Sequence, residues 1–157
     1  MTDGPRRPPA STSPVHVGAS SRHGRGVFSH TDLPVGTIVE VSPVLLITRA
    51  EGDRDDLFGR YIFEWDVDAD LTAYALALGC GSLFNHSGDP SCGYTRADDD
   101  EVIAASLAAA PAGVASCAVG VAPALIFTTL RPVVAGEELT IDYSGVGDDD
   151  LWFGVTD

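Results

Sequence analysis

Short apolar runs separated by glycine and proline fill most of this sequence, and they restrict the chain to a fold made of many short strands. The longest run, TIVEVSPVLLI at 37–47, is rich in β-branched residues, which favour strands. Shorter runs of similar character lie at 15–20, 61–66 and 124–133, each bounded by turn formers. The helical signal is weak, although VIAASLAAA at 102–110 is rich in alanine, the best helix former. We therefore predict a mostly β fold with irregular loops and few short helices.

The composition divides the 157 residues into a tail and a single domain. Residues 1–14 are rich in proline, serine, threonine and arginine, which predicts a disordered N-terminal tail. The remainder, 15–157, has the usual size and apolar content of one domain. The segment ALALG at 75–79 fits either a short helix or a buried turn, because periodicity cannot distinguish them over so few residues.

The formal net charge of −14 narrows the classes of partner. An acidic surface repels phosphates, so we expect no direct binding of nucleic acid. The same charge would attract a basic protein, although it serves plain solubility equally well. The sequence has no apolar run of membrane-spanning length and no signal-peptide pattern. We therefore expect no membrane association and a cytoplasmic location, or a nuclear one in a host that has a nucleus.

Cysteine and histidine give no sign of a metal site. The three cysteines, Cys80, Cys92 and Cys117, are scattered and form no CxxC pair. The four histidines also lack the spacing of metal ligands, so we expect no bound metal. The odd number of cysteines offers no disulfide framework and indicates a reducing compartment.

Three polar segments remain as candidates for chemistry. HGRG at 23–26 is either a glycine-rich turn that lets a ligand approach the backbone or an ordinary hairpin turn. FNHS at 84–87 is either a functional loop or a polar turn with local hydrogen bonds. GEELTIDY at 136–143 ends in a tyrosine that is either catalytic or structural. No GxSxG, HExxH or GxGxxG pattern accompanies them, which argues against a hydrolase and against a dinucleotide enzyme.

In this order, the segments HGRGVFS (23–29), GSLFNHSGDPSCGY (81–94) and LRPVVAGEELTIDY (130–143) resemble the SET-domain family of protein lysine methyltransferases, in particular its small stand-alone members. The resemblance runs from about Val15 to Tyr143. It implies a SET-domain fold of small curved β-sheets, in which the FNHS and ELTIDY segments meet in a knot-like crossing. It also implies S-adenosylmethionine as the cofactor and methyl transfer to a lysine of a basic protein, such as a histone-like or ribosomal protein.

The resemblance assigns roles to individual residues. Tyr143 would be the catalytic tyrosine, with its hydroxyl beside the transferring methyl group. Arg25 and Gly26 would contact the methionine part of the cofactor. Asn85 would bind its ammonium or carboxylate end, and His86 would meet the adenine through its backbone. The alternative for the chain is a non-catalytic SET-like binding module for basic protein segments, but the presence of Asn85, His86 and Tyr143 argues against it.

Aromatic residues are further candidates for the site. Phe63, Trp65 and Tyr94 would line the substrate channel for the lysine, where cation–π attraction can hold a methylated ammonium, or they are plain core residues. Trp152, in the C-terminal tail 144–157, would close the cofactor site in place of the zinc-binding tail that this sequence lacks. The hydroxyl of Tyr94 would limit the product to one or two methyl groups.

Two departures from the family pattern are expected to matter. Ser91 stands where the family has asparagine, which predicts a weaker brace for the loop after FNHS. The Ala/Gly-rich stretch 102–124 has the character of an insertion, and it could serve as a mobile flap or as the contact of a homodimer.

Overall fold

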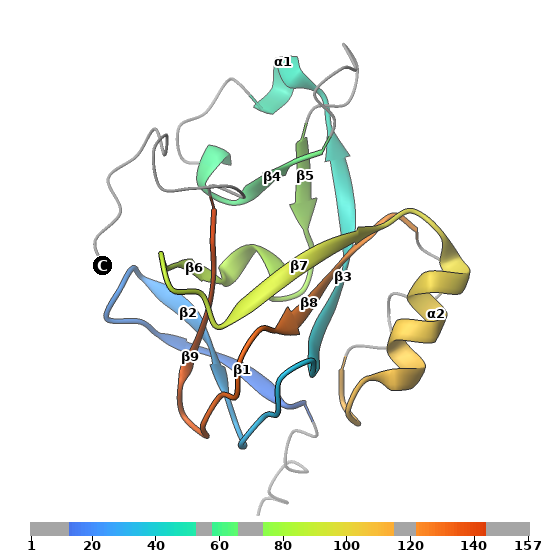
Figure 1. The fold of residues 1–157 in the computed structure, drawn as a ribbon. Helices are drawn as coiled ribbons and strands as arrows, with labels where there is room; N and C mark the ends of the chain where they lie inside the picture. The colour runs from blue at the N-terminus through green and yellow to red at the C-terminus, as the bar shows by residue number, and fades with distance from the viewer. Residues whose placement is uncertain (1–12, 53–57, 66–73, 115–121, 144–157) are drawn as a thin grey trace, which may run out of the picture.

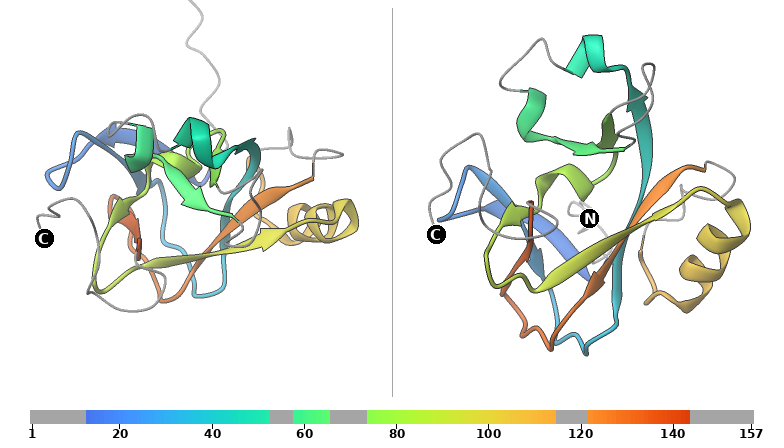
Figure 2. Two further views of the ribbon diagram at one scale, coloured as in Figure 1. Left: turned by 90° about the horizontal axis from the view of Figure 1, so that it is seen from above. Right: turned by 45° about the horizontal axis from the view of Figure 1, so that its top comes forward.

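The computed structural model describes residues 13–52, 58–65, 74–114 and 122–143, and these form two small, strongly curved sheets (Figures 1 and 2). The first sheet has the order β1 (Val15–Ala19), β2 (Arg25–Ser29), β9 (Glu138–Ile141) and β6 (Asn85–His86). The second has the order β4 (Ile62–Glu64), β5 (Tyr74–Ala77), β3 (Ile38–Ile47), β8 (Ala124–Thr129) and β7 (Cys92–Ala97). The helical elements in the described part are α1 (Arg49–Gly52), η1 (Phe58–Arg60), η2 (Gly81–Leu83) and α2 (Asp100–Ala109). The predicted mostly β fold is confirmed.

Strand β3 organises the second sheet, as its long β-branched run predicts. Its first half pairs with β8 and its second half with β5, both antiparallel. The segment 75–79, predicted as a short helix or a buried turn, lies instead mostly in β5. The reason is tertiary: β5 has a hydrogen-bonded neighbour on each side, β3 and β4, and this pairing decides a segment whose local preference is ambiguous.

The main core lies between the two sheets and is centred on Phe127 of β8. The ring of Phe127 stacks on the ring of Phe84, with centroids 4.6 Å apart and planes 3° apart, and both side chains are fully buried. Gly81 of η2 makes this packing feasible, because a Cβ atom there would lie 3.0 Å from the Phe127 ring and 2.7 Å from the Ala77 side chain. The stack thereby fixes Phe84, the residue directly before the polar Asn85.

A second core cluster lies beneath α2, at one side of the molecule (Figure 1). Ile103 of α2 is fully buried against β3, β7 and β8, where it meets Val41 and Ala97. The Asp99 carboxylate caps the helix by accepting the Glu101 backbone N–H at 2.6 Å. The helical character of the first part of 102–124 is thus confirmed, whereas its service as a flap or a dimer contact stays a prediction.

Two turns of related geometry precede β3 and β9. Leu33 and Val133 exchange backbone hydrogen bonds of 2.8 and 2.9 Å across an isolated bridge. Three residues after each of them, Gly36 and Gly136 adopt φ values of +78° and +85°, which side-chain-bearing residues rarely adopt. The two turns therefore form a local repeat, although the letters of the two segments differ too much to reveal it.

The first sheet contains the crossing of the FNHS and ELTIDY segments. Strand β9 lies between β2, to which it is antiparallel, and β6, to which it is parallel. Asn85 is opposite Thr140 and His86 is opposite Ile141, and the Ser87 backbone N–H extends the pairing to the Ile141 carbonyl at 3.0 Å. Residues far apart in the chain are thus held in register at the place where the sequence predicts the site.

Candidate functional site

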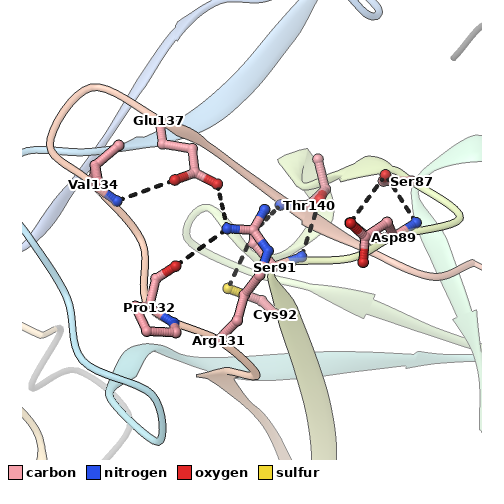
Figure 3. A network of polar contacts seen from close by, with 9 residues as sticks. All are labelled: Ser87, Asp89, Ser91, Cys92, Arg131, Pro132, Val134, Glu137 and Thr140. Atoms are coloured by element: carbon pink, nitrogen blue, oxygen red, sulfur yellow. Dashed lines mark hydrogen bonds and ion pairs between the residues drawn. The ribbon is translucent and has the colours of Figure 1, made fainter.

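The loop after β6 is braced by Ser91, the residue that departs from the family pattern (Figure 3). The Thr140 backbone N–H donates to Ser91 Oγ at 2.9 Å, and the Ser91 backbone N–H donates to Thr140 Oγ1 at 3.3 Å. Both residues are buried. Within the loop, the Asp89 backbone N–H donates to Ser87 Oγ at 3.2 Å. The serine hydroxyl therefore supplies a brace of its own between the loop and β9.

Removing this hydroxyl is expected to destabilise the fold. Ser91→Ala leaves the buried Thr140 N–H without its acceptor, which typically costs about 1–3 kcal/mol of unfolding free energy. Urea denaturation followed by circular dichroism measures the change. Ser106→Ala is the matched control, because Ser106 Oγ donates to the Val102 carbonyl on the exposed side of α2, and it should change stability by less than about 0.5 kcal/mol. Equal stability of the two variants would contradict the brace.

Asn85 sits at the junction of the β1–β2 turn and β9. Its Nδ2 group is 2.7 Å from Glu138 Oε1, 3.1 Å from the Arg25 carbonyl and 3.3 Å from the His23 carbonyl. Three acceptors around one amide nitrogen fix the orientation of the amide, because the carbonyl oxygen cannot donate. In the described part of the chain, no residue donates a hydrogen bond to Asn85 Oδ1. The side chain therefore presents an acceptor that suits a ligand ammonium group.

Gly26 permits the close approach of these groups. It is buried on β2, and a Cβ atom at this position would lie 2.9 Å from Glu138 Cδ and 3.1 Å from Asn85 Nδ2. Any larger residue would push one of the two side chains away. Arg25, the neighbouring residue, is exposed, and its backbone carbonyl holds Asn85. Arg25, Gly26 and Asn85, predicted to share the cofactor site, are thus brought together.

Tyr143 and His86 are joined directly after β9. The Tyr143 hydroxyl donates to the Phe84 carbonyl at 2.6 Å, and its backbone N–H donates to His86 Nδ1 at 3.1 Å. The same Nδ1 atom lies 3.7 Å from Asp142 Oδ1. The predicted catalytic tyrosine is therefore held at both its backbone and its hydroxyl.

The environment of the Tyr143 phenol keeps it protonated. Burial, followed by the nearby Tyr61 phenol and the Glu138 carboxylate, raises its pKa to about 12. The hydroxyl donates its hydrogen bond to the Phe84 carbonyl, so its oxygen is left to accept a hydrogen bond from an amine N–H. A neutral phenol in a fixed position is therefore better suited to orienting a nucleophilic amine than to acting as a base that removes a proton from it.

Two of the three predicted channel aromatics meet at the core. The rings of Phe63 and Tyr94 pack edge to face with their centroids 5.0 Å apart. Both rings also contact the ring of Phe127, at centroid distances of 6.1 Å for Phe63 and 6.0 Å for Tyr94. Burial, with the nearby Asp142 and Glu64 carboxylates, raises the pKa of Tyr94. Because both rings are only partly buried, they can line a channel as well as close the core.

Trp65 has a different setting. It is buried, the Arg96 guanidinium lies 4.1 Å from its ring centroid, and Arg96 also donates to its backbone carbonyl. This double contact fixes the end of β4, so Trp65 packs into the core, and its place in the channel stays a prediction. Trp152, also predicted for the site, lies outside the described residues.

Buried thiol and phenol groups are expected to make the fold sensitive to alkali. Burial raises the pKa of Cys92 from 9.0 to about 11 and that of Tyr143 from 10.0 to about 12, and it also raises that of Cys80. The unfolded chain therefore loses these protons first, and stability should fall as the pH rises from about 9 to about 12. Thermal unfolding at a series of pH values tests this, and Tyr143→Phe should show a shallower fall above about pH 10. A melting temperature independent of pH in this range would contradict it.

Three residues of the site were missed from sequence: Glu138, Tyr61 and Phe127. Glu138 has the pattern of an exposed turn charge, and Tyr61 that of a strand aromatic. Phe127 lies in an apolar run, which indicates burial but not which neighbours it contacts. Only the tertiary arrangement brings Glu138 to Asn85, Tyr61 to Tyr143, and Phe127 to the rings of Phe63 and Tyr94.

Across residues 13–52, 58–65, 74–114 and 122–143, no group of three or more histidine, cysteine or acidic side chains is placed to hold a metal ion. None of the helices in those ranges combines the length and the apolar character that a membrane crossing requires.

Comparisons with known proteins agree with the geometry. The SET domain family model matches residues 24–144. The chain is 29% identical over 150 residues to "Histone-lysine N-methyltransferase, H3 lysine-37 specific" of Schizosaccharomyces pombe, covering 94% of this chain and 82% of that protein. The crystal structure of a candidate histone methyltransferase from Plasmodium falciparum matches the fold with a TM-score of 0.61 and 21% identity, over 90% of this chain and 98% of that one. The chain belongs to the SET-domain family of protein lysine methyltransferases.

Proposed function

We propose that this SET domain transfers a methyl group from S-adenosylmethionine to a lysine side chain of a basic protein. The observation that carries the proposal is the junction of β6 and β9, where Asn85 and Tyr143 are held by hydrogen bonds on the two sides of one crossing. The Schizosaccharomyces pombe relative is named for a histone H3 lysine, which supports a basic protein as the substrate class. An acidic chain with a net charge of −14 suits such a partner.

The residues present fit the amino-acid end of S-adenosylmethionine. Asn85 Oδ1 offers an acceptor for the ammonium group, because its amide nitrogen is occupied by three protein acceptors. The exposed Arg25 guanidinium suits the carboxylate. His86 would face the adenine through its backbone, and Trp152 would cover the site from the C-terminal tail. When bound, the cofactor supplies an electrophilic methyl group on its sulfonium.

The remaining residues act on the lysine. A free lysine amine has a pKa of about 10.4, so a surrounding that disfavours the charged form is needed to make it nucleophilic. The partly buried rings of Phe63 and Tyr94 provide such a surrounding. The Tyr143 hydroxyl then orients the amine, and alignment supplies much of the rate. We infer that the hydroxyl of Tyr94, whose ring packs against Phe63, limits the product to one or two methyl groups.

Methyl transfer to an external protein tests the proposal. The purified chain is incubated with radiolabelled S-adenosylmethionine and either core histones or ribosomal proteins, and Tyr143→Phe serves as the inactive control. The sequence contains no lysine, so labelled lysine can come only from the added protein. Mass spectrometry of the product should show mono- or dimethyllysine. Efficient trimethylation would contradict the product assignment.

The competing function is a non-catalytic module that binds basic protein segments. Calorimetry with S-adenosylmethionine separates the two functions. An enzyme binds the cofactor and labels a substrate, whereas a module that binds histone peptides without cofactor affinity or transfer would overturn the proposal. A homodimer through 102–124, the absence of nucleic-acid binding and a cytoplasmic or nuclear location remain predictions from the sequence.

A further inference from the structure

The carboxylate of Glu138 joins the two parts of the proposed cofactor site. Its Oε1 accepts from Asn85 Nδ2 at 2.7 Å, and its Oε2 accepts from Ser20 Oγ at 2.9 Å. The side chain is half-buried and lies against Gly26. Both oxygens are thus engaged, one with Asn85 of β6 and one with Ser20 at the start of the β1–β2 turn.

Ser20 in turn organises the backbone of that turn. Its Oγ accepts the backbone N–H of Arg22 at 2.9 Å and that of His23 at 3.4 Å. The Ser20 backbone N–H donates to the Gly24 carbonyl at 3.1 Å. The turn leading to Arg25 and Gly26 is therefore closed on Ser20, and Glu138 fixes Ser20 relative to Asn85.

The preceding residue, Glu137, has a separate task. Its carboxylate pairs with Arg131 at 2.7 Å and accepts the Val134 backbone N–H at 3.1 Å, so it braces the turn before β9 (Figure 3). Glu137 is the last residue of the turn and Glu138 is the first residue of β9, so the two adjacent glutamates serve different parts of the molecule. Of these two glutamates, only Glu138 contacts the proposed cofactor site.

We propose that Glu138 is a positioning residue for the cofactor. It orients the Asn85 amide so that Oδ1 faces the ligand ammonium. Through its bond to Ser20, it also fixes the position of the β1–β2 turn relative to Asn85. This inference rests on the proposed function, because it concerns the same cofactor site. Glu138 is thereby assigned to cofactor binding and not to methyl transfer, because its two carboxylate oxygens bond Asn85 and Ser20 and bond no residue of the proposed lysine channel.

Three variants test the inference: Glu138→Ala, Glu138→Gln and, as the matched control, Glu137→Ala. Calorimetry below the unfolding transitions gives the Kd for S-adenosylmethionine and for S-adenosylhomocysteine, and the methyl-transfer assay gives kcat and KM. Glu138→Ala should raise both Kd values about tenfold or more, because a charge-assisted bond to Asn85 is lost. Its kcat at saturating cofactor should stay within about threefold of the wild type, since only cofactor binding is weakened.

The controls separate positioning from general destabilisation. Glu138→Gln keeps an oxygen acceptor for Asn85 and should recover most of the affinity, whereas Glu137→Ala should bind like the wild type although it removes the same charge. Wild-type affinity in Glu138→Ala would overturn the inference, as would a loss confined to kcat or an unrescued loss in a stable Glu138→Gln. Failure of the wild type itself to bind S-adenosylmethionine would count against the proposed function instead.

Discussion

Replacing Tyr143 with phenylalanine is expected to lower kcat by about two to three orders of magnitude, the usual cost of one positioned polar group at a reacting centre. The variant loses the hydroxyl that donates to the Phe84 carbonyl at 2.6 Å and that would orient the lysine amine. The ring itself and the backbone bond to His86 are kept. The Kd for S-adenosylmethionine should therefore change little, and the defect should appear in kcat.

Steady-state methyl transfer and calorimetry on the same preparations measure these two effects. Tyr74→Phe is the matched control, because it removes the same hydroxyl from a β5 residue that has no place in the proposed site. The control should keep the wild-type kcat. A Tyr143→Phe enzyme with normal turnover would refute the assignment of Tyr143 as the catalytic residue.

Gly26→Ala is expected to weaken binding of S-adenosylmethionine by about 10- to 100-fold, because displacing Asn85 removes a charge-assisted hydrogen bond to the ligand ammonium, worth roughly 1.5–3 kcal/mol. The new Cβ would lie 2.9 Å from Glu138 Cδ and 3.1 Å from Asn85 Nδ2. Glu138 cannot simply swing away, because both its oxygens are bonded, to Asn85 and to Ser20. The substitution therefore breaks the arrangement that presents Asn85 to the cofactor.

Gly18→Ala is the control for this experiment, because Gly18 is the register partner of Gly26 in the same hairpin. Its Cβ would touch the Phe28 ring at 3.1 Å, which requires only a small shift, so affinity should stay near that of the wild type. Calorimetry with each variant gives the comparison. Equal affinity of Gly26→Ala and wild type would show that the cofactor does not depend on this junction.

The sequence predicted those parts of the fold that local chemistry determines. The long β-branched run at 37–47 predicted β3, and the alanine-rich start of 102–124 predicted a helix. The segment 75–79 is ambiguous from sequence, because its strand character depends on pairing with β3 and β4, which no local pattern reveals. Strand β6 has only two residues, and nothing in so short a segment distinguishes a strand from a loop.

The site residues divide in the same way, into those that a sequence motif indicates and those that only contacts between distant segments bring in. The resemblance to the SET-domain family predicts Asn85, His86 and Tyr143 as site residues, and the structure places them at one crossing. Glu138 could not be selected from sequence, because its partners Asn85 and Ser20 are far away in the chain and its neighbour Glu137 is the same residue type.

The central position of β9 has a consequence for how the molecule is made. The β1–β2 hairpin consists of sequence neighbours and can form as soon as residues near Ser29 leave the ribosome. The other edge of β2 stays unpaired until β9 has been synthesised. Pairing between distant segments carries the loop-closure entropy that slows folding. The nascent chain therefore holds an open sheet edge, prone to wrong pairing, from the synthesis of β2 until that of β9. Assembly of the active site should accordingly be among the last steps of folding, completed only when Tyr143 has been synthesised.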